Sequence, residues 1–229
     1  MNFHLETIGI IHSCFKEKFG IPRQSLLAPS ATATLELLPP FDQIDAVDGI
    51  EEFSHLWLTF IFHKNSDKGW KPKVRPPRLG GNKKIGVFAT RSTFRPNSLG
   101  LSAVKLEKVD NRDGKVLLHL SGIDIVDGTP VVDIKPYLPY SDTVKNAVGG
   151  FANHAPIEKV SVVFTKKSLA DIEKKGLPVL KKLIKEILLS DPRPAYYNED
   201  SKKQFGIKIF DFDIKWEFEN NLITVLGLE

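Results

Sequence analysis

The chain has 229 residues with a formal net charge of +4, and hydrophobic residues make up 41% of the sequence. This length suits one large domain or a domain with a small appendage, and the composition is ordinary for a globular protein. A single cysteine, Cys14, excludes an intramolecular disulfide and favours a buried thiol in a reducing compartment.

The first two-thirds of the chain consist of short β-rich segments separated by turn signals. Strands are expected at residues 5–11, 33–38, 53–63, 99–109, 115–121 and 129–134, and a helix at residues 45–52. The segment Asn111-Arg-Asp-Gly114 predicts a tight hairpin turn between two of these strands. Many short strands at this spacing favour a closed or nearly closed barrel over a parallel βαβ sheet.

The last third of the chain has a different pattern. Ser168 is expected to cap a helix that is interrupted near Gly176. The apolar face of the next helix consists of Leu177, Leu180, Ile184, Ile187 and Leu188. Alternating apolar residues between 210 and 218, the turn residues Asn220-Asn221 and a further β-rich segment then predict a terminal hairpin.

Together these patterns predict a mainly β fold with two domains. A β-barrel is expected at residues 1–155, and a small α+β domain at residues 156–229. The first residues lack the charged and apolar regions of a signal peptide, and no apolar run is long enough to span a bilayer. We therefore expect a cytoplasmic protein that is not bound to a membrane.

The strongest charge asymmetry lies between Lys68 and Lys105. This stretch holds ten Lys and Arg residues and no Asp or Glu, so the rest of the chain is net negative. Phe88 and Phe94 alternate with arginines, groups that stack on bases and pair with phosphates, and glycines and prolines fix the backbone at many points. A solvated, charge-biased loop is the alternative. The pattern favours a shaped surface that binds a polyanion.

Several kinds of chemistry find no support in the sequence. The six histidines are scattered, without a cysteine partner or metal-ligand spacing, so we expect no metal site. The chain also lacks a nucleophile elbow and a phosphate-cradling glycine motif that follows a strand and opens a helix. These absences argue against a hydrolytic triad and against a Rossmann nucleotide site.

Four other clusters carry polar groups suited to ligands. They are Pro22-Arg23-Gln24 after the first strand, His63-Lys64 at a strand end, the turn from Asp124 to Pro130, and a stiff loop projecting Arg193 and Tyr196. Each has an ordinary structural alternative: a loop charge, a satisfied histidine, aspartates that cap their own turn, and a packed tyrosine. Taken singly, none of the four decides between the two readings.

Taken together, these motifs resemble the TsaA-like, or TrmO, tRNA methyltransferases over nearly the whole chain. The resemblance is carried by Phe53-Ser-His-Leu-Trp-Leu58, the Arg75–Asn82 loop, Gly86–Ser102, Asp124–Pro130, Asp133–Tyr140 and Asp191–Tyr196. It implies a β-barrel methyltransferase, unlike the Rossmann type, that works as a homodimer with S-adenosylmethionine. The implied substrate is the adenosine 3′ of the anticodon in certain threonine tRNAs, whose threonylcarbamoyl-bearing exocyclic nitrogen receives the methyl group. The family includes shorter members that stop after the barrel, so the barrel is expected to hold the cofactor by itself.

The resemblance also implies which residues bind the cofactor. The matching positions are Pro22, Arg23, Gln24, His63, Lys64, Arg91, Leu101, Asp124, Ile125, Val126 and Asp127. Their chemistry is compatible, because S-adenosylmethionine offers a carboxylate to cations and ribose hydroxyls to carboxylates. Ser92-Thr93-Phe94 and Asn97-Ser98-Leu99 depart from the expected Ser-Pro-Phe and Asn-Pro-Ile, which leaves this loop less rigid while keeping its Arg, Phe and Asn side chains.

Two residues are candidates for the reacting group itself. Asn97 could accept the hydrogen bond of the nitrogen's proton, and Asp133 could act as the base, although a loop-fixing amide and a strand-end cap are the alternatives.

The residues expected to contact tRNA lie in the basic stretch and in the late loop. They are Arg75, Arg78, Phe94, Arg95, Arg193 and Tyr196. Two further hypotheses stay open: a non-catalytic RNA-binding module, and a methyltransferase of the same fold that acts on another acceptor.

Overall fold

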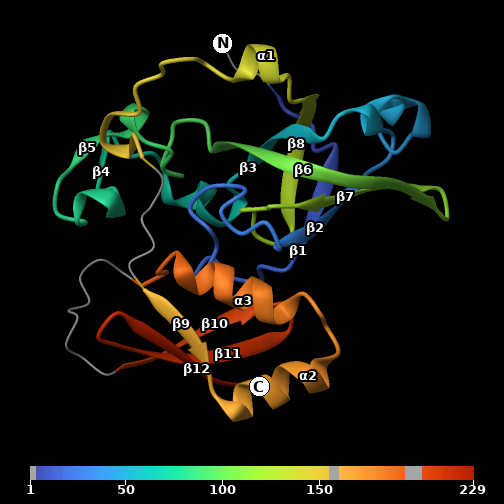
Figure 1. Cartoon of the computed structure of the whole chain (residues 1–229). Coiled ribbons are helices and arrows are strands. Elements are labelled where there is room, and N and C mark those ends of the chain that lie inside the picture. Colours follow the sequence, from blue (N-terminus) through green and yellow to red (C-terminus); the bar gives the residue numbers. More distant parts are fainter. Residues whose placement is uncertain (1–3, 155–159, 194–202) are drawn as a thin grey trace.

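The computed structural model describes residues 4–154, 160–193 and 203–229, and it contains twelve strands within these ranges. The strands are β1 (Gly9–Ser13), β2 (Thr32–Leu37), β3 (His55–Ile61), β4 (Lys73–Val74), β5 (Ile85–Gly86), β6 (Leu99–Arg112), β7 (Lys115–Ser121), β8 (Thr129–Pro136), β9 (Ser161–Phe164), β10 (Lys203–Ile209), β11 (Phe212–Glu219) and β12 (Leu222–Leu228). The α-helices are α1 (Pro139–Asp142), α2 (Lys166–Lys175) and α3 (Leu180–Leu189). In Figure 1 the β1–β8 body lies above α3, and the β9–β12 sheet lies below this helix.

Six strands close into an antiparallel barrel in the order β1-β2-β7-β6-β3-β8, which confirms the predicted closed barrel. Strand β3 shows why the sequence folds this way, because Leu56, Leu58 and Phe60 are buried while the residues between them are only half-buried. The Phe60 ring packs so closely on Gly100 of the neighbouring strand β6 that a Cβ at this position would not fit. The alternating residues of the sequence therefore point in turn to the inside and the outside of the barrel.

The β6–β7 hairpin has the turn that its sequence predicts. Arg112 pairs with Lys115 at the end of the ladder, and the two residues between them, Asp113 and Gly114, have positive φ angles of 53° and 77°. Asp-Gly is well suited to this left-handed geometry, because glycine carries no Cβ and aspartate tolerates it. The turn prediction is confirmed.

Two local predictions in the barrel are wrong. The helix expected at residues 45–52 is instead a pair of short 3-10 turns, η1 (Ile44–Val47) and η2 (Ile50–Glu52). Asp48 is in an extended conformation with ψ 131°, and Gly49 has φ +75°, so the backbone cannot continue as one helix. The first strand begins at Gly9 rather than at residue 5, because pairing with β2 and β8 starts there.

The second body is a four-stranded sheet in the order β10-β11-β12-β9, with α2 and α3 beside it (Figure 1). The predicted terminal hairpin is confirmed as β11 and β12, with positive φ angles at Asn220 and Asn221. The strands β9 and β10 were not expected, although Phe205, Ile207 and Ile209 alternate with more polar or smaller residues along β10.

The helix predictions for this body need two corrections. Thr165, not Ser168, caps α2, because the Thr165 Oγ1 accepts the Ser168 N–H at 3.1 Å. Leu183 completes the buried face of α3, while Leu177 lies before this helix begins. No helix among the described residues is long and apolar enough to cross a membrane.

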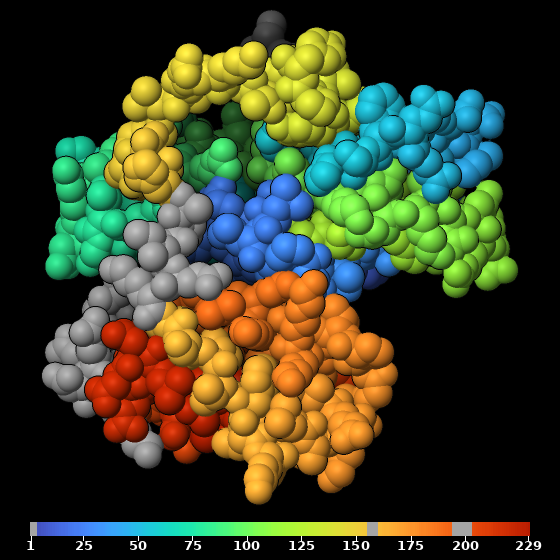
Figure 2. Space-filling view, viewed as in Figure 1, coloured from blue at the N-terminus to red at the C-terminus, as the bar shows by residue number. Residues whose placement is uncertain are grey.

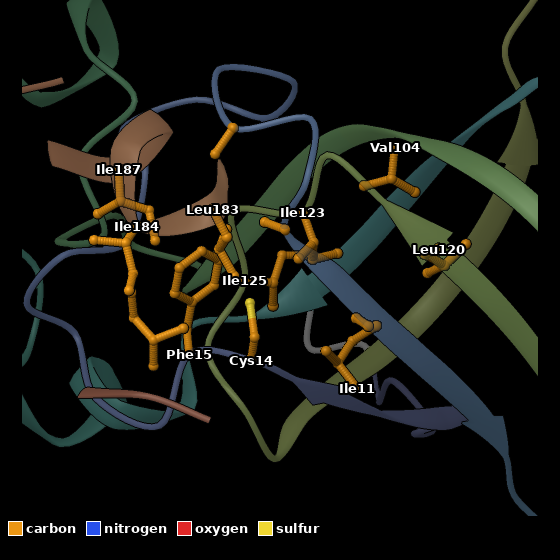
Figure 3. Close-up of a cluster of buried hydrophobic side chains, with 14 of the residues drawn as sticks. Ile11, Cys14, Phe15, Val104, Leu120, Ile123, Ile125, Leu183, Ile184 and Ile187 are labelled. Atoms are coloured by element: carbon orange, nitrogen blue, oxygen red, sulfur yellow. The ribbon is translucent and has the colours of Figure 1, made fainter. Parts of the chain in front are cut away.

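The barrel and the C-terminal sheet share one hydrophobic core. Figure 3 shows Phe15 and Cys14 beside Leu183 and Ile184 of α3, and all four side chains are buried. The backbones also join, because the Phe210 N–H donates to the Cys14 carbonyl oxygen at 2.7 Å. The expected domain boundary, between residues 155 and 156, falls within residues 155–159, which lie outside the described residues.

Cys14 lies at this junction as the small core residue that its sequence context favoured. Burial raises the pKa of its thiol to about 12, against the lowering effect of a hydrogen bond with Thr32. The group therefore stays a neutral thiol at pH 7, which rules out a nucleophilic thiolate at this position.

Candidate active site

Three segments that are far apart in the sequence meet at one side of the barrel. The Arg91 guanidinium donates to the Gln24 Oε1, which joins the basic stretch to the loop between β1 and β2. The same loop reaches the turn before β8, because the Leu26 N–H donates to the Gly122 carbonyl oxygen at 2.8 Å. Asp124 follows two residues later. We refer to Gln24, Ser25, Arg91, Ser102 and Asp124 as the Asp124 cluster.

Asp124 has an unusual electrostatic environment. Its Oδ1 is buried and has no hydrogen-bond partner among the described residues. Burial raises the pKa of the Asp124 carboxyl to about 6, although a hydrogen bond with Ser102, the Arg91 charge and a backbone hydrogen bond with Ser25 lower it. A buried acceptor without a partner costs free energy, so such a group is a candidate for contact with a ligand.

The Asp124 cluster includes two residues that sequence reasoning missed. Ser25 directly follows the motif Pro22-Arg23-Gln24, and Ser102 directly follows Leu101. Ser102 is buried on the inner side of β6, and a buried polar residue in an alternating strand is the signal that could have identified it.

Asp127, only three residues away, has the opposite character. Its Oδ1 accepts the Ser13 N–H at 2.9 Å, and its Oδ2 lies 2.9 Å from the Lys16 Nζ. The Asp127 N–H also donates to the Phe15 carbonyl oxygen at 2.8 Å. We call Ser13, Lys16, Lys64 and Asp127 the Asp127 cluster, in which the polar groups are already paired within the protein.

His63 directly precedes Lys64 of the Asp127 cluster, and the two residues begin η3 (His63–Lys68). The Lys64 Nζ donates to the Lys16 carbonyl oxygen at 3.1 Å. The His63 Nδ1 is buried without a hydrogen-bond partner among the described residues. Burial and then the Lys64 charge lower the pKa of His63, so the imidazole is neutral at pH 7 and can donate or accept one further hydrogen bond.

The side chains of the remaining expected cofactor residues differ in how far they are exposed to solvent. Leu101 is 58% exposed, while the Pro22 and Ile125 side chains are buried. Val126 is half-buried, and its carbonyl oxygen accepts the Thr129 hydroxyl at 2.6 Å. Arg23 is exposed at the loop tip, where its carbonyl oxygen accepts the Gln24 side-chain amide at 2.5 Å. The buried members of this set offer a ligand backbone atoms and shape rather than side-chain contacts.

The two candidates for the reacting step lie outside both clusters. Leu101 on β6 and Asp133 on β8 both pair with Thr59 of β3, which places them on either side of one central strand. The Asp133 Oδ1 accepts the Ile134 N–H at 3.0 Å, and the Oδ2 lies 2.5 Å from the Lys135 Nζ. Asn97 is exposed at the end of the basic stretch. Asp133 therefore lies within β8 rather than at a strand end, and its carboxylate is bonded to its chain neighbours Ile134 and Lys135.

The basic stretch contains both free and paired cations. The Arg75 side chain is exposed and forms no hydrogen bond or ion pair with another described residue. Arg78 donates to the His154 carbonyl oxygen at 3.0 Å, which ties the stretch to the segment after α1. Arg95 donates to the Thr90 carbonyl oxygen at 2.8 Å and thereby holds its own loop in shape.

The two phenylalanines of this stretch also differ. Phe94 is half-buried, and the Lys71 Nζ lies 4.2 Å from its ring centroid. Phe88 is 73% exposed, with the Arg95 guanidinium 5.7 Å from its ring centroid. The exposed Phe88 ring is therefore better placed than Phe94 to stack on a base.

The expectation of a projecting Arg193 is wrong. Its Nε and Nη2 lie 2.8 Å from the two carboxylate oxygens of Asp191, and its guanidinium lies 3.1 Å from the Phe218 ring centroid. The side chain is only 10% exposed, because this doubly bonded and stacked geometry holds it against the sheet. Its expected partner Tyr196 lies outside the described residues.

The fold and the site together define a β-barrel protein in which a carboxylate with one buried, unpaired oxygen lies near an arginine and a basic loop. No group of three or more His, Cys, Asp and Glu side chains within the described ranges forms a metal site. The sequence profile of the tRNA-methyltransferase O N-terminal domain matches residues 10–143, and that of the TrmO C-terminal domain matches residues 157–229. The chain therefore belongs to the TrmO family.

Individual relatives match the chain along its whole length. An Escherichia coli (strain K12) protein named tRNA (adenine(37)-N6)-methyltransferase is 47% identical, over 100% of this chain and 98% of that protein. A Pseudomonas aeruginosa PAO1 protein named "Putative S-adenosylmethionine-dependent methyltransferase RcsF" is also 47% identical, over the same shares of the two chains. The crystal structure of TrmO from Pseudomonas aeruginosa superimposes with a TM-score of 0.83 at 42% identity, covering 100% of this chain and 99% of the other.

Proposed function

We propose that this protein is a tRNA methyltransferase that transfers a methyl group from S-adenosylmethionine to the N6 nitrogen of adenine 37. The observation that carries the proposal is the buried Asp124 Oδ1, which has no hydrogen-bond partner among the described residues and lies near the Arg91 charge, in a chain whose whole length matches this family. Adenine 37 is the base directly 3′ of the anticodon. The enzyme's class and cofactor agree with the names of the relatives.

The residues of the Asp124 cluster fit the cofactor. S-adenosylmethionine supplies a methyl group on a positively charged sulfonium, which makes this methyl group reactive toward nucleophiles. The Asp124 Oδ1 is a buried acceptor without a partner, and it would accept a hydrogen bond from a ribose hydroxyl or an ammonium group. Arg91 would pair with the carboxylate of the cofactor, and Gln24 orients Arg91 by accepting its N–H.

His63 would complete the cofactor site. The unpaired His63 Nδ1 offers one hydrogen bond, and the neutral imidazole adds no charge beside a cationic ligand. Leu101 presents an exposed apolar surface on the outer face of β6, opposite the buried Ser102 side chain. Pro22, Arg23, Lys64, Ile125, Val126 and Asp127 belong to the same proposed site.

The protein's main contribution to the reaction is positioning. A nitrogen that attacks in line with the methyl–sulfur bond needs its lone pair held in one direction and its proton removed. Asn97 is exposed at the edge of the basic stretch, where its amide oxygen can accept a hydrogen bond from the nitrogen. Asp133 would need to give up its bond to Lys135 before it could take the proton, so Asn97 is the better-supported of the two.

We also propose that the natural substrate is threonine tRNA in which the same base already carries a threonylcarbamoyl group. The family resemblance supports this choice, and the exposed Arg75 and Phe88 offer one phosphate contact and one stacking surface. Arg78, Phe94 and Tyr196 complete the set proposed to reach the tRNA, and Arg78 would first have to release the His154 carbonyl oxygen. Arg95 and Arg193 were also expected there, but both are bonded within the protein. Such a substrate is consistent with a cytoplasmic enzyme.

A homodimer is the assembly that the resemblance implies. The helix α1 and the segment after it support this assembly, because Tyr140, Val144 and Val148 are 86%, 69% and 89% exposed. Figure 2 shows this segment in yellow, arching away from the barrel. Exposed apolar side chains gathered on one segment are typical of an interaction surface. Analytical ultracentrifugation of the purified chain would show a mass of one chain rather than two if this proposal is wrong.

The function is tested by comparing tRNA nucleosides from a deletion strain with those from strains complemented by the parent gene or by Asp124→Asn. Mass spectrometry should find the N6-methylated nucleoside only with the parent gene. Purified protein should then methylate threonine tRNA that carries threonylcarbamoyl and leave the same tRNA without this group unmodified.

Calorimetry with S-adenosylmethionine alone separates the remaining alternatives. Binding without RNA is expected for the methyltransferase. No binding at millimolar cofactor would indicate a non-catalytic RNA-binding module, and binding without any change in the tRNA nucleosides would indicate another acceptor.

A further inference from the structure

The loop between β1 and β2 carries part of the proposed cofactor site, and it is held from outside the barrel as well as from within it. This loop, residues 14–31, includes the motif Pro22-Arg23-Gln24 and the neighbouring Ser25. Figure 2 shows the C-terminal body lying against the blue N-terminal part of the chain. Contacts from this body reach both ends of the loop.

At the end of the loop that leads into β2, Glu186 of α3 holds Ser30 with both carboxylate oxygens. The Oε2 accepts the Ser30 N–H at 2.8 Å, and the Oε1 accepts the Ser30 hydroxyl at 2.9 Å. The Glu186 side chain is 16% exposed, and the Lys182 Nζ lies 3.8 Å from its Oε1. Hydrogen bonds to a partly buried carboxylate are stronger than neutral ones, so this contact fixes both the backbone and the side chain of Ser30.

At the end that leaves β1, strand β10 of the C-terminal body holds the loop. Phe15 forms an antiparallel bridge with Ile209, and the Glu17 Oε1 accepts the Lys208 N–H at 3.1 Å. Gly20 has φ +87° and lies so close to Ile207 that an added Cβ would be 3.2 Å from the Ile207 Cγ2. These contacts set where the loop turns toward residues 22–25.

We propose that Glu186 is a positioning residue for cofactor binding. It holds Ser30, and with it the β1–β2 loop, in the place where Gln24 reaches Arg91 and Ser25 reaches Asp124. The proposal rests on the proposed function, because it concerns the same cofactor site. All residues proposed to contact the cofactor still belong to the barrel, and a carboxylate of the C-terminal body would hold one wall of the site in place.

The test uses the full-length protein and measures cofactor affinity and loop protection separately. The variants are Glu186→Ala, Glu186→Gln and Ser30→Ala, with Asp171→Ala as the matched control. Asp171 accepts the Leu228 N–H at 3.2 Å, so its loss weakens the C-terminal body without touching the loop. Calorimetry with S-adenosylmethionine gives the dissociation constant, hydrogen exchange reports the Leu26 amide, and calorimetric melting gives the Tm.

Glu186→Ala should weaken S-adenosylmethionine binding by between about three- and about thirtyfold and speed exchange of the Leu26 amide. Ser30→Ala should have an effect in the same direction, and the double variant should be no worse than Glu186→Ala, because both changes break one contact. Glu186→Gln should stay near the parent, since its amide oxygen can accept the Ser30 N–H while the Ser30 hydroxyl accepts from its amide nitrogen.

Asp171→Ala should lower the Tm and leave both the affinity and the Leu26 exchange near the parent values. The proposal is overturned if Glu186→Ala binds the cofactor as the parent does, or if Asp171→Ala weakens binding equally at the same loss of Tm. Failure of the proposed function has a different signature, because the parent itself would not bind S-adenosylmethionine. In that case an unchanged Leu26 exchange rate in Glu186→Ala would still overturn the positioning role.

Discussion

The Asp124 and Asp127 clusters share one turn of the chain and contain the same kinds of groups, but they are paired in opposite ways. In the Asp127 cluster, both carboxylate oxygens already have partners, in the Ser13 N–H and the Lys16 ammonium group. In the Asp124 cluster, one buried oxygen has no partner among the described residues, and burial raises the pKa of the carboxyl. A saturated carboxylate holds a fold together, whereas an unsaturated one is prepared to bind a ligand.

The largest expected effect separates these two carboxylates. Asp124→Asn should weaken S-adenosylmethionine binding by roughly ten- to hundredfold, because a hydrogen bond to a charged group is lost. Asp127→Asn should weaken binding only a few-fold but lower the Tm, because it breaks contacts that hold the β1 end of the loop. Calorimetry and thermal melting of both variants test this difference. Equal losses of affinity in the two variants would contradict the distinction between the two carboxylates.

A smaller loss is expected at the cation of the Asp124 cluster. Arg91→Ala should weaken cofactor binding by about tenfold, because it removes the charge proposed to pair with the cofactor's carboxylate and the donor to Gln24. The control is Lys64→Ala in the Asp127 cluster, which loses a bond to a backbone carbonyl and should weaken binding less. Unchanged affinity in a folded Arg91→Ala protein would remove this residue from the site.

The raised pKa of Asp124 predicts a stability cost that depends on pH. Between pH 4 and 6 the folded carboxyl holds its proton while the unfolded one has lost it, so the free energy of unfolding falls as pH rises. Relative to Asp124→Asn, the parent should lose about 1–3 kcal/mol over this interval and no more above it. Denaturant unfolding of both proteins at pH 4, 5, 6 and 7 gives the difference, and a constant difference would contradict the raised pKa.

The smallest effect applies the same distinction to the basic stretch. Arg75→Ala should reduce the slope of log Kd for tRNA against log salt by about 0.7–0.9, which corresponds to one lost phosphate contact. Arg95→Ala should leave this slope near the parent value and lower the Tm instead, because Arg95 is bonded to its own loop. Equal slopes for the parent and Arg75→Ala would show that the exposed arginine faces away from the RNA.

The sequence was sufficient to predict the barrel, because alternation along β3 and the Asp113-Gly114 turn are local features. It could not tell Asp124 from Asp127, because the partners that saturate Asp127 come from β1 and the loop after it, more than a hundred residues earlier. The prediction that Arg193 projects from its loop was also wrong because of a contact between distant segments. The Phe218 ring under its guanidinium belongs to β11. The family resemblance named the members of the site, and the fold then distinguished the paired residues from the unpaired ones.

The most direct test of the central claim is a crystal structure of the protein with S-adenosylhomocysteine, the demethylated form of the cofactor. We expect a ligand atom within hydrogen-bond distance of the Asp124 Oδ1 and the ligand carboxylate beside Arg91, with the Asp127 contacts to Ser13 and Lys16 unchanged. A ligand bound elsewhere, with the Asp124 Oδ1 still unpaired, would contradict it.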